Sequence, residues 1–297
     1  MRAAALIYNP TAGRRRHAQL LESVLSALRD GGFEVEPVPT QAPGDATRLA
    51  RDRAGRMEVV FAFGGDGTVR EAAAGLLGTK TALGIVPGGT VNVLSMSLGL
   101  PRDPLTAARL AGRLEVQKLD VGLIGGMPFL MMVSAGLDSS VMAALDTRLK
   151  WRIGKGAYLL AGLREWWRYP YHRFEVIADG AGGVPLEASF VAVSNIPYYG
   201  GAYALAPGAH PHDGKLDLVL FRGHGRLATL GFAIDLLRGV HLRRSDVTVR
   251  HVREVELRSP AGAIAQIDGD VCEERLPFTV RIAPDPLLVL SPEIPPT

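Results

Sequence analysis

The chain has 297 residues, 47% of them hydrophobic and 21% charged. That length and hydrophobic content predict a globular protein with a real core, built as two domains or as one large domain. The net charge of +3 arises in residues 1–120, where 15 basic residues stand against 12 acidic ones, and it is too small for a nucleic-acid-binding stripe.

The single cysteine and the length of the apolar runs bear on the compartment. Cys272 excludes an internal disulfide and favours a reducing, cytoplasmic environment. The opening MRAAALIYNP breaks at Asn9-Pro10 without a cleavage pattern, so we expect a first strand there and not a secretory leader. No stretch reaches the roughly 18 uninterrupted apolar residues that span a bilayer.

Residues 1–120 alternate between strand and helix patterns. Short apolar runs at 3–8, 58–63 and 82–86 predict buried strands, and the apolar spacing within 17–30 predicts an amphipathic helix. Such alternation is typical of a parallel sheet with helices on its faces. The predicted fold class of this part is therefore α/β.

Beyond residue 120 the pattern changes. Turn-bounded, β-branched runs predict antiparallel strands at 173–179, 187–195, 215–221, 246–259 and 277–283. Helical patterns interrupt them only near 139–168 and 226–242. We expect a first domain over residues 1–120 and a second, mainly β domain over 121–297, with the last residues free to return to the first.

The stretch GGDGT at 64–68 stands where a strand turns into a helix. Thr68 and Glu71 have the spacing of a capping box, so we expect the helix to begin within the glycine cluster. Helix N-termini present free N–H groups, and glycine lets a phosphate approach them. A tight turn without a ligand is the alternative. The dinucleotide fingerprint is excluded, because Arg70 stands where its last glycine belongs.

Two more strand ends carry glycine and threonine. NPTAG at 9–13 follows the first strand, and PGGTVN at 87–92 follows the strand ALGIV. The carboxyl ends of parallel strands share one edge of a sheet, where ligands bind in open α/β folds. The three loops are therefore predicted to enclose one nucleotide.

These motifs, followed by SNIPYYGGAYALAPGAHPHDGKLDLVLF at 194–221 and IDGD at 267–270, make the chain similar to a known family. It resembles the diacylglycerol kinase catalytic-domain family of lipid kinases, which includes sphingosine and ceramide kinases and soluble bacterial members. The resemblance implies an NAD kinase- or phosphofructokinase-like nucleotide domain followed by a β-sandwich that carries the lipid side. It also implies transfer of the ATP γ-phosphate to a lipid hydroxyl. Diacylglycerol is the leading acceptor, with phosphatidylglycerol, a sphingoid base and an isoprenoid-type alcohol left open. A soluble-metabolite kinase and a catalytically silent binding module are the alternatives.

The resemblance implies particular contacts to ATP and Mg²⁺. Asp66 would hold Mg²⁺, since a bare carboxylate among phosphates is otherwise repelled; turn or capping duty is the alternative. The implied ATP contacts are Asn9, Pro10, Thr11, Ala12, Gly13, Thr40, Gly64, Gly65, Asp66, Gly67, Thr68, Val69, Arg70 and Thr90.

IDGD supplies the carboxylates implied for catalysis. By resemblance, Asp270 occupies the position of the base that accepts the lipid hydroxyl proton, and the division of roles between Asp268 and Asp270 stays open. An Asp-Gly hairpin turn is the structural alternative. Asp138, in SAGLDSSVMAAL, is expected mainly as a helix N-cap, with a lipid head-group contact as the alternative.

Two further sites are implied on the second domain. By resemblance to bacterial members, Asp213 with the main-chain oxygens of His210 and Lys215 would hold a structural Mg²⁺. Residues 151–174 hold all three tryptophans beside five basic residues, which suits peripheral contact with the inner face of an anionic membrane. Packing of the aromatic side chains is the alternative for this segment, and a homodimer is left open.

Overall fold

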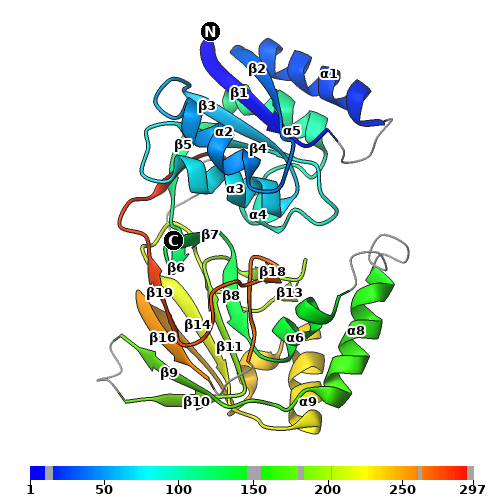
Figure 1. Ribbon diagram of the computed structural model, residues 1–297, viewed down its shortest axis with the longest axis vertical. Coiled ribbons are helices and arrows are strands. Elements are labelled where there is room, and N and C mark those ends of the chain that lie inside the picture. Colours follow the sequence, from blue (N-terminus) through cyan, green and yellow to red (C-terminus); the bar gives the residue numbers. More distant parts are fainter. Residues whose placement is uncertain (11–15, 146–154, 180–183, 202, 260–262, 293–297) are drawn as a thin grey trace. The chain divides into compact units, whose positions relative to one another are not determined.

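The computed structural model describes residues 1–10, 16–145, 155–179, 184–201, 203–259 and 263–292 (Figure 1). The chain forms two compact units. Unit 1 runs from Met1 to Val121 and resumes at Ala283, and unit 2 is Gly122–Ile282. Among the helices that the structure describes, none is long and apolar enough to cross a membrane.

Unit 1 alternates strands and helices. Its elements are β1 (Arg2–Tyr8), α1 (Arg16–Asp30), β2 (Phe33–Pro39), α2 (Asp45–Arg53), β3 (Val59–Gly64), α3 (Asp66–Leu76), β4 (Ala82–Pro87), α4 (Val93–Ser97), α5 (Pro104–Leu110), the 3-10 turn η1 (Ala111–Arg113), β5 (Glu115–Leu119) and β20 (Leu287–Ser291).

One sheet, in the order β2-β1-β3-β4-β20-β5, organises unit 1. The first five strands are parallel neighbours, and β5 runs antiparallel to β20 at the edge. The central strands are buried along nearly their whole length, because α1 and α5 cover one face while α2 and α3 cover the other (Figure 1). Burial on both faces explains why these strands read as continuous apolar runs.

Unit 2 is built mainly from antiparallel strands. Its elements are β6 (Gly122–Ile124), β7 (Met127–Phe129), β8 (Met132–Ala135), α6 (Leu137–Ala144), α8 (Lys155–Arg168), β9 (Phe174–Ala178), β10 (Leu186–Ala188), β11 (Phe190–Ser194), β12 (Tyr198–Tyr199), β13 (Tyr203–Ala204), β14 (Leu216–Phe221), α9 (Arg226–Leu237), the 3-10 turn η2 (His241–Arg243), β15 (Val247–Val252), β16 (Glu254–Arg258), β17 (Ala265–Ile267), β18 (Asp270–Val271) and β19 (Phe278–Ile282).

Two six-stranded sheets make the sandwich of unit 2. Their orders are β10-β9-β16-β19-β6-β7 and β15-β14-β11-β8-β17-β18. Side chains of both sheets interdigitate in one core, which includes Phe129, Phe174 and Leu218. Strand β14 is also buried on its outer face, where Phe221 stacks on Phe232 of α9 with ring centroids 4.5 Å apart. The α/β plus β-sandwich fold class predicted from the sequence is confirmed.

Two predicted strands are each divided between the sheets. The run 187–195 contains β10 and β11, which meet at Ser189, and the run 246–259 contains β15 and β16, which meet at Arg253. At the first break the Ser189 N–H leaves the ladder of β10 and donates to the Phe221 carbonyl at 2.8 Å. A single apolar periodicity cannot reveal such a switch, because both strands send alternate residues into the same core.

Candidate active site

Four strand ends of unit 1 meet at one edge of its sheet. In the register of the ladder, Tyr8 lies beside Pro39 and Phe63, and Gly64 lies beside Pro87. The residues that follow these strands therefore lie close together at this edge of the sheet. Thr40 is tied to this edge by its N–H, which donates to the Tyr8 carbonyl at 2.9 Å. The order of strands reverses between β1 and β3, the position where ligands bind in open α/β sheets.

The loops after β3 and β4 pack directly against each other. The Gly88 N–H donates to the Gly64 carbonyl at 2.7 Å. A Cβ on Gly89 would lie 2.7 Å from the Gly65 Cα and 2.8 Å from Asn92 Oδ1, so Gly89 is required by the contact between the two loops. Only backbone without side chains allows this approach.

Asn92 closes the second loop on itself. Its Oδ1 accepts from the Gly89 N–H and its Nδ2 donates to the Gly89 carbonyl, both at 2.9 Å. Asn92 has a left-handed φ of 54°, which asparagine tolerates better than most residues, and it is buried. The motif PGGTVN contains this residue, but its loop-closing role depends on a backbone conformation that the sequence does not display.

Helix α3 begins within the glycine cluster, as the sequence predicts, but Thr68 and Glu71 do not form the capping box at its start. Gly65 is the N-cap, and no side chain caps the helix there. The first helical hydrogen bond runs from the Val69 N–H to the Gly65 carbonyl at 3.2 Å. Glu71 instead accepts from the Ala46 N–H at the start of α2 at 3.3 Å. Extended glycine backbone at Gly65 allows the helix to start at Asp66, inside the cluster.

The glycines of this cluster differ in what surrounds them. A Cβ on Gly64 would meet Thr68 Oγ1 at 2.6 Å, whereas a Cβ on Gly67 would meet nothing within 4 Å. Gly64 is therefore needed for packing. Gly67 lies exposed in the first turn of α3, where backbone N–H groups have no partner within the helix. Open space beside such groups is what a bound anion requires.

Asp66 spans the two glycine loops. Its Oδ2 accepts from the Val93 N–H at 3.1 Å and its Oδ1 from the Leu94 N–H at 3.2 Å. The carboxylate thus accepts from the first N–H groups of α4. Capping of this kind is the alternative to Mg²⁺ binding that the sequence offered for Asp66. Burial raises the pKa of Asp66 above its usual value, and the hydrogen bonds from Val93, Leu94 and its own backbone oppose that rise.

The remaining residues implied to contact ATP differ in their exposure to solvent. Asn9 is half-buried and Pro10 exposed directly after β1, Arg70 is half-buried, and Thr90 is exposed at the tip of the second loop. Val69 points into the core of unit 1 and is 2% exposed. Thr11, Ala12 and Gly13 lie outside the described residues.

In unit 2, the two carboxylates of IDGD have different surroundings. Asp268 is 8% exposed and accepts three backbone N–H groups, from Leu130 at 2.9 Å, Met131 at 2.9 Å and Met132 at 3.0 Å. Its φ of 49° is left-handed. Asp270 begins β18 and is exposed. The hairpin alternative is partly right, since β17 and β18 do form a short antiparallel pair around this turn.

A chain of polar side chains connects this turn to Asp138. The Gly269 N–H donates to Gln266 Oε1 at 2.8 Å, and Gln266 Nε2 donates to Ser134 Oγ at 2.6 Å. The Ser134 hydroxyl donates in turn to Asp138 Oδ2, which also accepts from the Tyr199 hydroxyl at 3.3 Å. Sequence reasoning missed Gln266, although a glutamine inside the buried run AIAQI signals a polar contact.

Asp138 is not the helix N-cap that its sequence context predicts. The N-cap of α6 is Gly136, with a φ of 156°, and Asp138 lies one residue inside the helix. Its carboxylate turns toward Ser134 and Tyr199 instead. Burial raises the pKa of Asp138, and burial together with the nearby Asp138 carboxylate raises the pKa of Tyr199 well above its usual value.

The loop implied to hold a structural cation is closed by its own hydrogen bonds. Asp213 Oδ1 accepts from the Lys215 N–H at 2.9 Å, and the His210 carbonyl accepts from the His212 N–H at 2.8 Å. Throughout the described part of the chain, no three His, Cys, Asp or Glu side chains gather closely enough to hold a metal ion by themselves. Any cation in this loop would therefore need main-chain oxygens or water.

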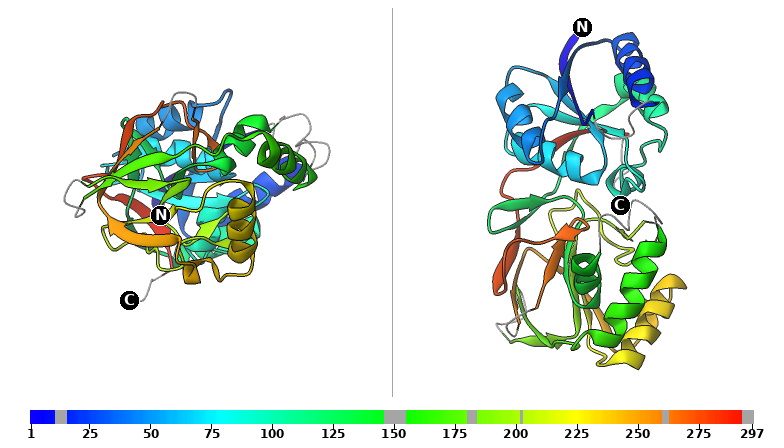
Figure 2. Two further views of the ribbon diagram at one scale, coloured as in Figure 1. Left: turned by 90° about the horizontal axis from the view of Figure 1, so that it is seen from below. Right: turned by 45° about the vertical axis from the view of Figure 1, so that its right-hand side comes forward.

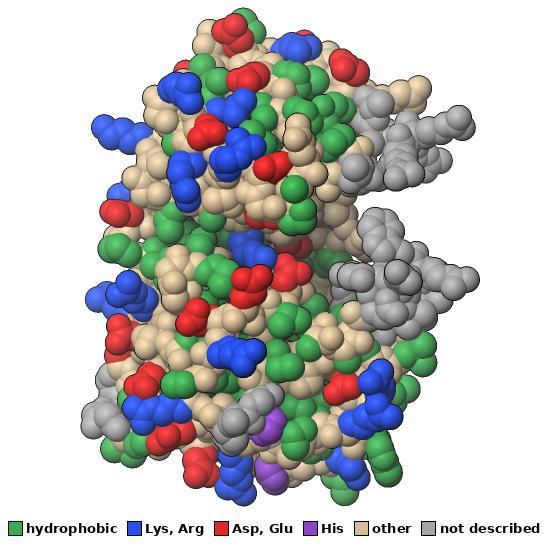
Figure 3. All heavy atoms as spheres, viewed as in Figure 1, with side chains coloured by type: hydrophobic (Ala, Val, Ile, Leu, Met, Phe, Trp, Pro, Cys, Tyr) green, Lys and Arg blue, Asp and Glu red, His purple; other side chains and the backbone are tan. Residues whose placement is uncertain are grey.

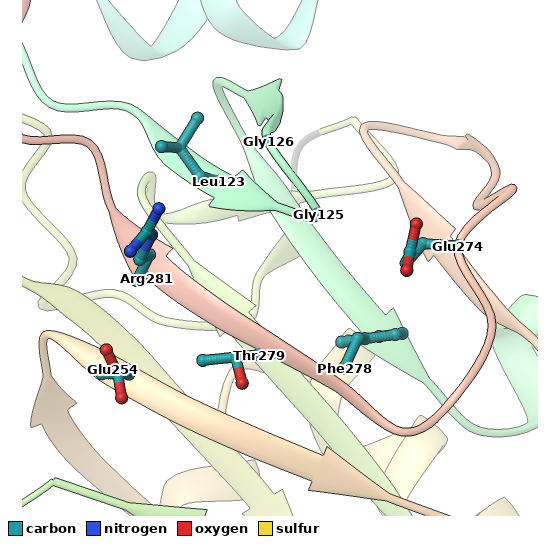
Figure 4. Close-up of a pocket in the computed structure, with 8 residues that line it drawn as sticks. All are labelled: Leu123, Gly125, Gly126, Glu254, Glu274, Phe278, Thr279 and Arg281. Atoms are coloured by element: carbon teal, nitrogen blue, oxygen red, sulfur yellow. The ribbon is translucent and has the colours of Figure 1, made fainter.

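A separate groove of about 450 Å³ lies on the outer face of the β16-β19-β6 sheet (Figure 4). Its charged lining residues are Glu254, Glu274 and Arg281. The IDGD turn belongs to the other sheet of the sandwich. The groove is therefore separate from the IDGD turn.

Comparisons with known proteins agree with this architecture. Residues 3–124 match the family model of the diacylglycerol kinase catalytic domain, and residues 131–291 match that of the YegS C-terminal NAD kinase beta sandwich-like domain. The chain is 33% identical to the protein of Chromohalobacter salexigens named "Probable lipid kinase YegS-like", over 94% of this chain and 91% of that one. It is 30% identical to the diacylglycerol kinase of Bacillus subtilis, over 91% and 90% of the two chains.

Solved structures give the same result. A crystal structure of a diacylglycerol kinase from Bacillus anthracis superposes with a TM-score of 0.81 at 26% identity, covering 98% of this chain and 97% of that one. The family resemblance noted in the sequence is thereby confirmed. The chain belongs to the diacylglycerol kinase family of lipid kinases, enzymes that phosphorylate a lipid alcohol.

Proposed function

We propose that this protein transfers the γ-phosphate of ATP to the hydroxyl of a lipid in a Mg²⁺-dependent reaction, with diacylglycerol as acceptor and phosphatidic acid as product. The observation that carries the proposal is the edge of unit 1 where two packed glycine loops surround the open first turn of α3. An anionic phosphate chain suits this position, because helix N–H groups and the helix dipole both favour negative charge.

The residues of unit 1 fit a nucleotide and its cation. The open space at Gly67 leaves room for phosphate oxygens beside the first N–H groups of α3. Asp66 supplies carboxylate oxygen, the ligand type that Mg²⁺ prefers, at the junction of both loops. When bound, the cation neutralises charge on the phosphates. Thr40 and Asn9, at the ends of β2 and β1, are the proposed contacts to the rest of the nucleotide.

The acceptor chemistry is assigned to unit 2. Asp270 is exposed, so a lipid hydroxyl can reach it, whereas Asp268 is buried and accepts three backbone N–H groups; Asp270 is therefore the proposed proton acceptor. As the acceptor oxygen bonds to the γ-phosphorus, the bond from that phosphorus to the bridging oxygen breaks and ADP leaves. The hydroxyl proton passes to the Asp270 carboxylate.

A single methyl group tests the nucleotide site. Gly67→Ala places a Cβ in the open space at the start of α3, and it should weaken ATP binding at least ten-fold in calorimetric titration with Mg²⁺. Gly162→Ala is the matched control, because Gly162 also lies in a helix with nothing within 4 Å of an added Cβ. Equal ATP affinity of both variants and the parent would mean that the turn binds no phosphate.

The acceptor is tested by labelled ATP with a total lipid extract, with NAD as the soluble alternative and mass spectrometry of the product. Labelled phosphatidic acid supports the proposal. Labelling of NAD alone would make the protein a soluble-metabolite kinase, and labelling of neither would favour a silent binding module.

Two secondary roles complete the proposal. The loop at His210, Asp213 and Lys215 is proposed to hold a structural Mg²⁺ through oxygen atoms, which predicts a higher melting temperature in Mg²⁺ than in chelator. The enzyme is proposed to work in the cytoplasm, in peripheral contact with the membrane that contains its acceptor.

A further inference from the structure

Helix α9 of unit 2 presents an apolar stripe to solvent. Leu227, Leu230, Ile234 and Leu237 are spaced at helical intervals and are 82%, 42%, 39% and 59% exposed. A surface helix normally has polar residues on its outer face. Contiguous exposed apolar side chains of this kind mark an interaction surface.

The inner face of α9 already accounts for its attachment to the sandwich. Phe232 is 5% exposed and stacks on Phe221, and Ala228 and Leu236 pack in the same cluster. The outer stripe is therefore not needed for packing within unit 2. Its four side chains are available to a partner.

Helix α8 adds to this surface. Leu160, Leu163 and Trp167 are 54%, 57% and 62% exposed, and Arg164 and Arg168 are exposed on the same side of the helix. These positions recur at intervals of three and four residues, so they share one face. Figure 1 and the right-hand view of Figure 2 show α8 (green) beside α9 (yellow to gold), and hydrogen bonds connect them.

Contacts at the end of α8 join the two helices. The guanidinium of Arg226 lies 4.3 Å from the centre of the Trp167 ring and donates to the Trp167 carbonyl at 2.7 Å. The Trp166 indole N–H donates to the Arg226 carbonyl at 3.1 Å. Trp166 is thus half-buried and serves packing, while Trp167 faces solvent. The α8 face continues into the α9 stripe through Arg226.

The exposed charged side chains around this surface are mainly basic. Arg164, Arg168, Arg226 and Arg238 are exposed beside the apolar side chains, and Figure 3 shows green and blue side chains intermingled over this region. The acidic residue of α9, Asp235, is neutralised by Arg244 at 2.8 Å. The acidic residue of α8, Glu165, lies 3.7 Å from Arg164, so these two charges offset each other and the positive charge comes mainly from Arg168, Arg226 and Arg238.

We infer that the α8–α9 face docks on an anionic lipid bilayer, with Leu227, Leu230, Ile234 and Leu237 inserting among the acyl chains. Apolar side chains flanked by arginine are the composition that binds at an anionic headgroup boundary. A second copy of the chain suits the surface less well, because it would bring arginines against arginines. The inference rests on the proposed function in one respect, since an acceptor lipid within a bilayer has to be reached from its surface.

Co-sedimentation with vesicles tests this surface without any kinase reaction. The parent should pellet with vesicles of equal parts phosphatidylglycerol and phosphatidylcholine. The triple variant Leu227→Gln/Leu230→Gln/Leu237→Gln should bind about 100-fold more weakly, from roughly five-fold per leucine side chain. Arg164→Gln/Arg168→Gln should weaken binding about five-fold per charge on these vesicles and hardly at all on pure phosphatidylcholine. Val116→Thr/Val249→Thr, which replaces exposed valines elsewhere, should bind like the parent.

Three results would overturn the inference. The first is pelleting of the triple variant like the parent. The second is equal loss of pelleting in the valine control. The third is a parent that is dimeric in solution and becomes monomeric in the triple variant while vesicle binding persists, which would assign the face to a second copy. Leu237→Gln alone, at the last residue of α9, repeats the test if the triple variant does not fold.

A kinase assay separates this inference from the proposed function. With acceptor lipid in detergent micelles, the triple variant should match the parent, because docking on a bilayer is then unnecessary. A parent that phosphorylates no lipid but still shows the expected pattern of vesicle binding would refute the proposed function and support the docking surface.

Discussion

Replacing Asp268 by Asn should destabilise unit 2, because this carboxylate is built into the backbone. Its two oxygens accept N–H groups from three consecutive residues, Leu130 at 2.9 Å, Met131 at 2.9 Å and Met132 at 3.0 Å. Asparagine tolerates the left-handed φ of 49°, so backbone strain does not enter. One carboxylate oxygen, however, becomes an NH₂ group that must face an N–H donor.

The magnitude follows from the number of bonds affected. Hydrogen bonds to a charged group contribute about 1.5–3 kcal/mol each, and a buried N–H left without an acceptor costs about 1–3 kcal/mol. One bond is lost and the others become bonds to a neutral amide. The expected loss is therefore about 3–4 kcal/mol in the free energy of unfolding, a large part of the stability of an ordinary domain.

Urea unfolding followed by circular dichroism measures this loss, with Asp270→Asn as the matched control. Asp270 is exposed, so its substitution should change stability by less than about 0.5 kcal/mol while lowering the lipid kinase rate about 10² to 10⁴-fold. A shared urea midpoint for Asp268→Asn and the parent would refute the structural role. Loss of activity in a fully stable Asp268→Asn protein, with Asp270→Asn still active, would move the base to Asp268.

Gly89→Ala should destabilise unit 1 by about 1–3 kcal/mol in urea unfolding, because its Cβ would lie 2.7 Å from the Gly65 Cα; an unchanged midpoint would show that the two loops separate easily. Asp138→Asn should flatten the pH dependence of unfolding. Burial raises the pKa of Asp138 above 3.8, so the native state keeps this proton to a higher pH than the unfolded chain and stability falls as pH rises beyond 3.8. The same slope in variant and parent would contradict that assignment.

Local patterns in the sequence determined the fold class and the position of the sheet edge that is proposed to bind the nucleotide. Apolar runs separated by helical spacing predict a parallel sheet, and parallel strands necessarily bring their carboxyl ends to one edge. The glycine-rich stretches after β3 and β4 therefore had to meet, and the ladder places Gly64 beside Pro87. The acidic pair of IDGD was likewise visible, because an Asp-Gly dipeptide predicts a turn.

Tertiary structure alone decided what each of these residues touches. Asp268 and Asp270 look alike in the sequence, but Asp268 meets backbone N–H groups 136 to 138 positions away, and only the folded sandwich brings those groups to it. Thr68 and Glu71 have the spacing of a capping box, yet Glu71 turns to Ala46 of α2. Helix α9 carries apolar side chains on its outer face as well as on its inner face. The spacing of apolar residues in the sequence therefore could not tell which leucines the core would cover. Spacing fixes which residues share an element, whereas contacts between distant segments decide which side chains are buried, paired or left to a partner.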